Sequence, residues 1–196
     1  MVGGITILPI LLIPVETAAG ETRVAASPET VKKFIALGCR VVLERGAGRT
    51  SGFLDEAYSE AGAHLVTPGD SQAWEEADVL LCVQSPSPVD LGRLRRGALV
   101  VGLLAPYANV ELDAALKRCG LSAMALELLP RISRAQSADA LSSQANIAGY
   151  KSVLLASAAL DRYFPMLMTA AGTVQPARVV VLGAGVAGLQ AVATAR

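Results

Sequence analysis

The sequence predicts an α/β protein built on a parallel, Rossmann-like sheet. Over residues 10–125, short apolar runs alternate with helix-compatible segments. Strands separated by helices need crossover connections, which give parallel pairing. Near the end, the β-branched run 179–182 precedes Gly183, Gly185 and Gly188 in G-x-G-x-x-G spacing. A buried strand, a glycine turn and a helix start form the nucleotide-binding turn of a Rossmann unit, although an ordinary βα turn is the alternative.

Six apolar runs are interpreted as strands, with helices between them. The expected strands are residues 10–15, 40–44, 64–66, 79–83, 98–104 and 122–125. The expected helices are residues 28–37, 55–61, 72–77, 91–95 and 111–119. Local signals support the first helix, because Ser27 can cap it, Pro28 suits its first position and Gly38 can end it.

A long helix is expected over residues 137–163. Apolar residues lie along two of its sides, so it should be buried between layers and link two lobes. Arg131, Gln136, Asp139 and Ser142 place hydrogen-bonding groups at its N-terminal end. Such a cluster can hold a carboxamide, which needs both a donor and an acceptor. The alternative is a loop that satisfies only its own helix cap.

These elements divide the chain into three parts. Residues 1–130 form an N-terminal α/β lobe, residues 131–165 the polar loop and long linking helix, and residues 166–196 the first strand, turn and helix of a second, NAD-binding Rossmann lobe. Eight residues follow Gly188, whereas the acidic residue that holds the ribose is expected roughly 20 residues on. We therefore expect this second lobe to be truncated and the chain to belong to a longer protein.

Composition excludes several classes of protein. Apolar residues make up 53% of the chain and the formal net charge is zero, so a large core is expected and a nucleic-acid footprint is not. The early apolar stretch is too short to span a bilayer and contains Pro9, so no membrane insertion is expected. The three cysteines and the single histidine, His64, lack metal-ligand spacing, which indicates reduced thiols, a structural histidine and no metal.

The polar loop carries a family resemblance. The run Glu-Leu-Leu-Pro-Arg-Ile-Ser-Arg-Ala-Gln-Ser at 127–137 resembles the NAD(H)-binding domain of proton-translocating NAD(P) transhydrogenase, α subunit. Gly-Glu-Thr-Arg-Val-Ala at 20–25, Met-Thr-Ala-Ala-Gly-Thr at 168–173 and the glycine turn at 183–189 are similar to it as well. The resemblance covers nearly everything from residue 10 onward, and the 131–137 segment is far more specific than the glycine turn.

The resemblance implies direct hydride transfer between NAD(H) and NADP(H), coupled to proton movement through a separate membrane component. It implies a homodimer, NADP(H) bound on a partner component, and a cytoplasmic location peripheral to the inner membrane. NAD(H) would lie between two lobes, and no general acid or base would be required. The residues implied around the nicotinamide and its ribose are Arg131, Ile132, Ser133, Gln136, Asp139 and Ser142. Those implied along the adenosine diphosphate are Gly183, Gly185, Val186 and Gly188.

Two other functions remain open. Alanine dehydrogenase shares the architecture, but its pattern has a Lys and a His at strand ends that correspond here to Cys82 and Leu104. Without a cation for a carboxylate and an acid or base for the imine, amino-acid chemistry lacks its catalytic groups. The third possibility is a non-catalytic folding or dimerisation module. Residues 1–6 are extra or displaced relative to the family pattern.

Overall fold

A computed structural model describes residues 8–196. The chain contains two compact units, of which the first ends at Leu129 and the second is Pro130–Arg196. The unusual N-terminal residues 1–6 lie outside the described residues.

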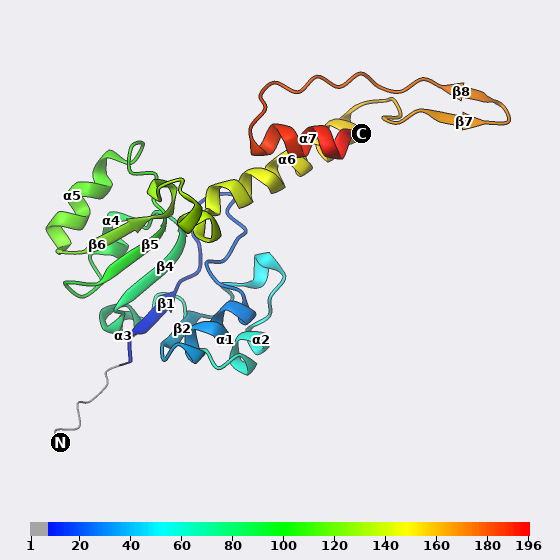
Figure 1. The fold of residues 1–196 in the computed structure, drawn as a ribbon. Coiled ribbons are helices and arrows are strands. Elements are labelled where there is room, and N and C mark those ends of the chain that lie inside the picture. The colour runs from blue at the N-terminus through cyan, green and yellow to red at the C-terminus, as the bar shows by residue number, and fades with distance from the viewer. Residues whose placement is uncertain (1–7) are drawn as a thin grey trace. The chain divides into compact units, whose positions relative to one another are not determined.

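The first unit is built on a six-stranded sheet in which every paired strand is parallel, in the order β3-β2-β1-β4-β5-β6. Its strands are β1 Ile10–Ile13, β2 Arg40–Glu44, β3 His64–Val66, β4 Val79–Gln84, β5 Leu99–Leu103 and β6 Ser122–Ala125. This is the strand order of a Rossmann sheet, and the order reverses between β1 and β4. The predicted fold class is confirmed (Figure 1).

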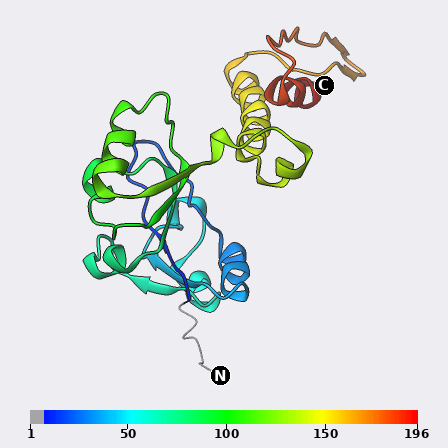
Figure 2. The same cartoon turned by 60° about the vertical axis from the view of Figure 1, so that its left-hand side comes forward.

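Helices cover both faces of this sheet (Figures 1 and 2). They are α1 Pro28–Ala36, α2 Asp55–Glu60, α3 Ser71–Glu76, α4 Pro88–Leu91 and α5 Val110–Cys119. Successive side chains of a strand point to opposite faces, so Leu43 packs with α1 and α2 while its neighbour Val42 packs with α3, α4 and α5. The result is two hydrophobic cores separated by the sheet.

A local capping signal predicted the start of α1 correctly, but the start of α4 was misplaced. The hydroxyl of Ser27 accepts a hydrogen bond from the Thr30 N–H at 3.3 Å, which caps α1 as expected. The expected helix at 91–95 is wrong, because α4 is Pro88–Leu91. Ser87 accepts a hydrogen bond from the Asp90 N–H at 3.1 Å and so starts the helix one turn earlier.

The second unit contains two helices and a hairpin. Its elements are the 3₁₀ helix Ser133–Ala138, α6 Ala140–Ala159, β7 Leu167–Thr169, β8 Gly172–Val174 and α7 Val186–Ala195. Helix α6 is shorter than the expected 137–163, because Asp139 caps it at its start and Leu160 is already extended. The antiparallel β7–β8 hairpin was not predicted, and every residue of its strands is exposed.

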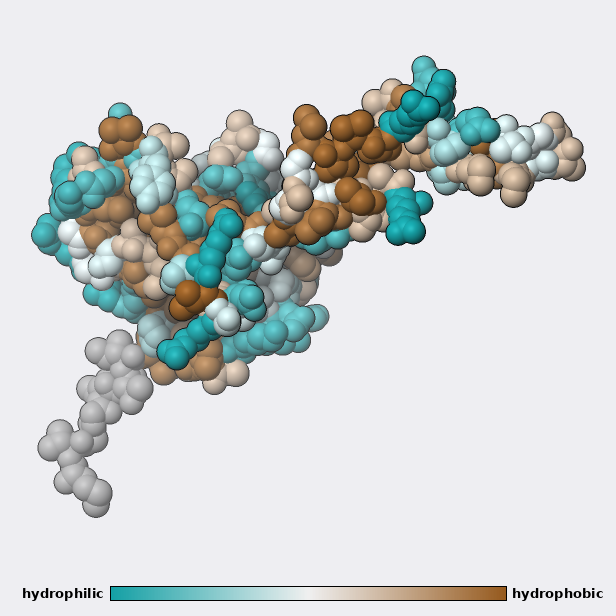
Figure 3. Space-filling model, turned by 45° about the horizontal axis from the view of Figure 1, so that its top comes forward, coloured by the Kyte–Doolittle hydropathy of each residue, from teal (hydrophilic) through white to brown (hydrophobic). Residues whose placement is uncertain are grey.

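Two expectations for the second unit are wrong. Residues 179–182 form no strand, and Val180 and Leu182 are 82% and 93% exposed. An apolar run becomes a strand only when a neighbouring strand takes up its backbone hydrogen bonds, and no described residue does so here. Helix α6 is not buried on two sides, since only Gly149 and Val153 of it are buried. Ile147, Leu155 and Leu189 of this unit are exposed, and Figure 3 shows brown, apolar surface on the second unit.

Within the described residues, no helix is both long and apolar enough to cross a bilayer. Cys82 is buried, whereas Cys39 and Cys119 are half-buried, and all three are free thiols. His64 opens β3 and is exposed, and the described residues contain no cluster of side chains suited to a metal ion.

Candidate functional site

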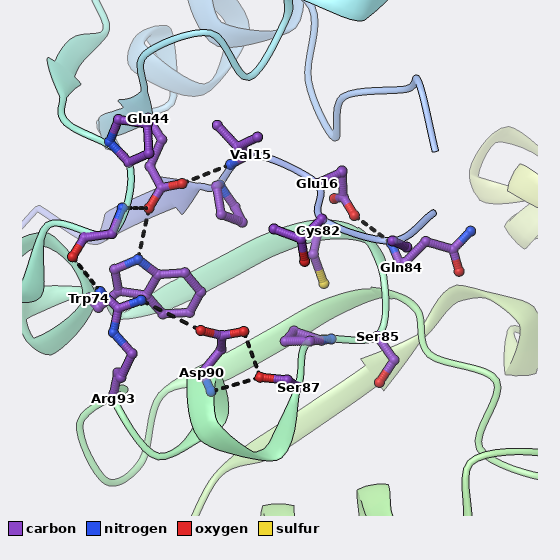
Figure 4. A pocket seen from close by; sticks show the side chains of 16 residues that line it. Val15, Glu16, Glu44, Trp74, Cys82, Gln84, Ser85, Ser87, Asp90 and Arg93 are labelled. Carbon is purple, nitrogen blue, oxygen red and sulfur yellow. Dashed lines mark hydrogen bonds and ion pairs between the residues drawn. The ribbon is translucent and has the colours of Figure 1, made fainter. Parts of the chain in front are cut away.

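A cavity lies in the first unit at the carboxyl ends of the strands, beside the point where the strand order reverses (Figure 4). In open α/β sheets, ligands bind at this switch point. The cavity has a volume of about 400 Å³, within the range of small-molecule sites. It is lined by Pro14, Val15, Glu16, Thr17, Ala18, Glu44, Pro68, Gly69, Trp74, Cys82, Gln84, Ser85, Pro86, Ser87, Asp90 and Arg93.

Glu44, at the end of β2, organises one wall of the cavity. Its side chain is 4% exposed, yet three N–H donors surround it. Its Oε1 accepts hydrogen bonds from the Gly69 N–H at 2.8 Å and the Trp74 indole N–H at 2.9 Å. Its Oε2 accepts from the Val15 N–H at 2.9 Å. A buried carboxylate is tolerated when its oxygens are hydrogen-bonded in this way, so Glu44 joins the segments after β1 and β3 to helix α3.

Two further carboxylates bind the segment after β1 to the end of β4. Glu16 accepts hydrogen bonds from the backbone N–H groups of Val83 and Gln84, and burial raises the pKa of its carboxyl group. Glu21 accepts hydrogen bonds from the Arg23 guanidinium and, at 2.7 Å, from the Gln84 amide. The hydrogen bond from Arg23 lowers the pKa of Glu21 to about 2. This edge of the sheet therefore presents carboxylates that already have donors.

The remaining wall carries one cation. The Arg93 guanidinium lies 4.5 Å from the centre of the Trp74 ring, a cation–π distance. It also donates to the Gly69 carbonyl at 2.7 Å and pairs with Asp90 at 3.5 Å. Burial raises the pKa of the Cys82 thiol to about 12, so this thiol stays protonated and is a poor nucleophile.

The polar cluster expected at the start of α6 is only partly assembled. Asp139 accepts hydrogen bonds from the Ser142 N–H at 2.9 Å and the Ser142 hydroxyl at 2.6 Å. These hydrogen bonds lower the pKa of Asp139, and Arg131 adds a smaller electrostatic contribution. The backbone carbonyl oxygen of Gln136 accepts a hydrogen bond from the Asp139 N–H at 3.2 Å, and Gln136 itself is exposed. Asp139 and Ser142 therefore form a helix cap, and Arg131, Ile132 and Ser133 lie exposed beside it.

The glycine turn has the backbone geometry that its sequence predicts. Gly183 has a φ of +107°, which favours glycine. A Cβ at Gly188 would overlap the Gly183 carbonyl oxygen, so this position also needs glycine. Gly185 is the N-cap of α7 and has nothing within 4 Å of an added Cβ. Val186 starts the helix, whose first N–H groups lack partners within the helix and can receive an anion.

Helices α6 and α7 pack closely against each other. A Cβ on Gly149 would overlap the Ala187 carbonyl oxygen, and the Asn146 amide donates to Gln190 at 3.2 Å. The glycine turn at the start of α7 therefore lies near Gly149, and Asp139 lies ten residues earlier on the α6 side. At a rise of about 1.5 Å per residue, a ligand that touches both must extend over roughly 15 Å along α6.

Sequence reasoning missed the cavity of the first unit entirely. One signal was available, because Glu44 follows the apolar residues 41–43 at the end of its strand and Ser-Pro-Ser-Pro follows another strand. Interpreting that signal requires the strand order, which depends on pairing between distant segments. The polar cluster and the glycine turn were found because each is local in sequence.

The fold and the glycine turn define the chain as an α/β protein with a Rossmann-type sheet. Residues 12–148 match the family model described as alanine dehydrogenase/PNT, N-terminal domain, and residues 152–196 match the corresponding C-terminal domain. The chain belongs to this alanine dehydrogenase/PNT family.

Transhydrogenase subunits are among its most similar relatives. It is 47% identical over 191 residues to the first part of NAD(P) transhydrogenase subunit alpha of Rhodospirillum rubrum, covering 95% of this chain and 50% of that protein. It is 35% identical over 186 residues to alanine dehydrogenase of Mycobacterium tuberculosis, covering 91% and 48%. The chain therefore spans about half the length of these relatives.

Among solved structures too, a transhydrogenase is more similar to this chain than an alanine dehydrogenase is. The transhydrogenase of Sinorhizobium meliloti superposes with a TM-score of 0.90 at 49% identity, covering 95% of this chain and 53% of that one. An L-alanine dehydrogenase superposes with a TM-score of 0.81 at 31% identity, covering 95% and 51%. By sequence and structure the chain is more similar to the transhydrogenases.

Proposed function

We propose that this chain supplies the NAD(H)-binding part of an NAD(P) transhydrogenase, which transfers hydride directly between NAD(H) and NADP(H). One observation carries the proposal. A glycine turn with an open N-cap stands in the same unit as the Arg-Ile-Ser-Arg-Ala-Gln-Ser segment, in a chain whose relatives at 40–47% identity are transhydrogenase α subunits.

The residues divide into two groups by chemistry. The diphosphate would be received by backbone N–H groups at the start of α7, beside Gly183, Gly185, Val186 and Gly188. The nicotinamide and its ribose would be held by Arg131, Ile132, Ser133, Gln136, Asp139 and Ser142. Asp139 can accept from a ribose hydroxyl or carboxamide and Ser142 can donate, so their existing hydrogen bond would be exchanged for bonds to the ligand.

The protein's contribution to hydride transfer is positioning. NAD(H) supplies or accepts the hydride, and no proton need be moved by a side chain, because the nicotinamide rings exchange it directly. Gln136 would act where NADP(H), bound by a partner component, meets the nicotinamide. Homodimerisation, coupling to proton translocation by membrane components, and a cytoplasmic position peripheral to the inner membrane belong to the same proposal.

Alanine dehydrogenase chemistry is the weaker candidate. The positions that we compare with its catalytic Lys and His are Cys82 and Leu104, which are 6% and 0% exposed. Neither is a cation or a proton carrier at neutral pH. Activity with alanine and NAD in a full-length relative carrying these residues would reverse this preference.

Calorimetric titration of the 196-residue chain with NADH tests the proposal. We expect a Kd between about 1 μM and 1 mM, corresponding to roughly −8 to −4 kcal/mol. Gly185→Ala should fold normally, because a Cβ there meets no neighbour, yet weaken NADH binding at least about tenfold by occupying the diphosphate's space. Gly92→Ala, in the first unit, is the matched control and should leave binding unchanged. Absence of heat with the unmodified chain would instead support a folding or dimerisation module.

Gln136→Asn tests the positioning role in the chain assembled with its NADP(H)-binding partner. Shortening the side chain should slow hydride transfer more than it weakens NADH binding, because the amide would act only where the two nicotinamides meet. Stopped-flow rates and NADH affinity, measured on the same variant, give the comparison. Equal losses in rate and affinity would contradict the role.

A further inference from the structure

Charge is divided unequally between the two units. Residues 130–196 contain six cations, namely Arg131, Arg134, Lys151, Arg162, Arg178 and Arg196, and only two carboxylates, Asp139 and Asp161, so their net charge is +4. Because the whole chain is neutral, residues 1–129 carry −4. Such asymmetry between two parts of a chain indicates an electrostatic role for one of them.

The cations of the second unit make no ion pair within the described structure. The ion pairs found among residues 8–196, such as Arg95 with Asp78 and Lys117 with Asp113, lie in the first unit. None of the six cations of residues 130–196 has a carboxylate side chain within 4.0 Å among those residues. A dinucleotide diphosphate at the glycine turn would bring two negative charges and leave this unit at about +2.

Two of these arginines share a hollow within the second unit. It is lined by Ala159, Leu160, Asp161, Arg162, Gln175, Pro176, Ala177 and Arg178. The Ala177 N–H donates to the Phe164 carbonyl oxygen at 3.0 Å, so the segment after α6 and the segment after β8 are held side by side. The hollow therefore has a fixed base, and its two guanidinium groups come from segments joined by a backbone hydrogen bond.

The position of the hollow separates it from the proposed nucleotide site. Arg178 precedes the apolar run 179–182, and the glycine turn follows that run. No residue that lines the hollow belongs to the glycine turn 183–188, so the paired arginines are distinct from the proposed diphosphate site.

The shape of the hollow favours a macromolecule. Its volume is about 950 Å³, but seven of its lining residues are exposed and Ala177 is half-exposed. Small-molecule sites bury most of their ligand, and this surface would not. A guanidinium pairs with a carboxylate through two parallel hydrogen bonds, and a concave surface fits projecting side chains better than a flat lipid surface. We propose that the hollow between Arg162 and Arg178 docks a carboxylate-rich segment of a partner protein.

Binding of a fluorescein-labelled oligoglutamate peptide to the full chain tests this proposal. The double variant R162Q/R178Q should weaken binding about tenfold. The matched double variant K151Q/R196Q removes the same charge outside the hollow and should weaken it less than about twofold. If the first variant fails to fold by circular dichroism, R162K/R178K replaces it, and loss of the planar guanidinium groups at constant charge should still weaken binding.

Several results would overturn the proposal. These are no binding of the peptide by the unmodified chain, and equal losses in the two charge variants. Saturable binding of inorganic phosphate that R162Q/R178Q abolishes would show a small-anion site instead. Binding to phosphatidylserine vesicles without binding to the peptide would show a lipid surface. Self-association lost only in R162Q/R178Q would make a second copy the occupant. Titration of both double variants with NADH tests the proposed nucleotide site separately. If the hollow is distinct from that site, neither variant should change the affinity for NADH.

Discussion

At the residue scale, Glu44 shows how one side chain can order a whole edge of the sheet. Its two oxygens accept hydrogen bonds from three N–H groups that come from three different segments. The Trp74 indole N–H is buried with the carboxylate, so this hydrogen bond cannot be lost without a desolvation penalty. The carboxylate therefore stabilises the cavity wall through the groups around it as much as through its own burial.

Glu44→Gln should be strongly destabilising although it changes few atoms. An amide NH₂ in place of one oxygen would face an N–H donor and leave that donor unsatisfied. We expect a loss of about 3 kcal/mol in the free energy of unfolding, measured by urea titration. Glu29→Gln, on the exposed face of α1, is the control and should leave the midpoint unchanged. Similar midpoints for the two variants would contradict this account of Glu44.

Glu21 predicts a defined pH dependence. Its folded-state pKa is lowered to about 2 from an ordinary value of 4.5, first by the hydrogen bond from Arg23. A lowered pKa contributes stability above about pH 4.5, and this contribution is lost as the pH falls from 4.5 toward 2. Unfolding midpoints of the wild type and Glu21→Gln should therefore converge over this range. A difference that stays constant from neutral pH down to the folded-state pKa would rule out the pairing.

At the element scale, the sequence predicted best what short-range signals control. Ser27 and Pro28 fix the start of α1, and the strands 40–44, 64–66 and 122–125 were assigned with the observed bounds. The start of α4 was misplaced because the Ser87 cap competes with an apolar pattern that begins further along the chain. The run at 179–182 was misassigned for a different reason. A strand forms only beside a hydrogen-bonded partner strand, and the apolar pattern of the sequence does not show whether one is present.

The helix pair of the second unit depends on one glycine. Gly→Ala inside a helix is normally stabilising by roughly 1 kcal/mol, but a Cβ at Gly149 would overlap the Ala187 carbonyl oxygen. Gly149→Ala should therefore have the opposite sign and destabilise the α6–α7 pair by about 1–3 kcal/mol. Hydrogen exchange of α6 and α7 amides measures the effect, with exposed Ser157→Ala as the control. Slower exchange in Gly149→Ala would show that the helices do not meet there.

At the scale of the whole molecule, the two units differ in how much apolar surface they bury. The first encloses two cores on opposite faces of its sheet. In the second, Gly149, Val153 and Ala191 are the buried residues of its helices. Burial of apolar surface is the main favourable term in folding, so we expect the first unit to have the larger free energy of unfolding.

Residues 8–129 expressed alone should therefore fold, and residues 130–196 alone should not. We expect a cooperative thermal transition in circular dichroism for the first fragment and a broad, non-cooperative one for the second. The full chain provides the reference. A cooperative transition in the second fragment would show that residues 130–196 fold on their own despite their exposed apolar surface.

How much of the candidate site could be predicted from the sequence depends on how far apart its residues lie along the chain. Asp139 and Ser142 are close neighbours in the chain, as are the three glycines, so the local geometry of each group follows from spacing. The cavity beside Glu44 combines side chains from several strand ends and helices. Only the strand order β3-β2-β1-β4 brings them together, and order is a property of the assembled sheet.

The chain contains a single tryptophan, and it lines that cavity. Trp74 is 4% exposed, its indole N–H is bonded to Glu44, and Arg93 lies over its ring. Its emission should consequently report on the first unit alone, with a blue-shifted maximum in the native protein and a red shift when that unit opens. An unlabelled sample in a fluorimeter can then distinguish a molecule entering this cavity from one that binds elsewhere on the chain.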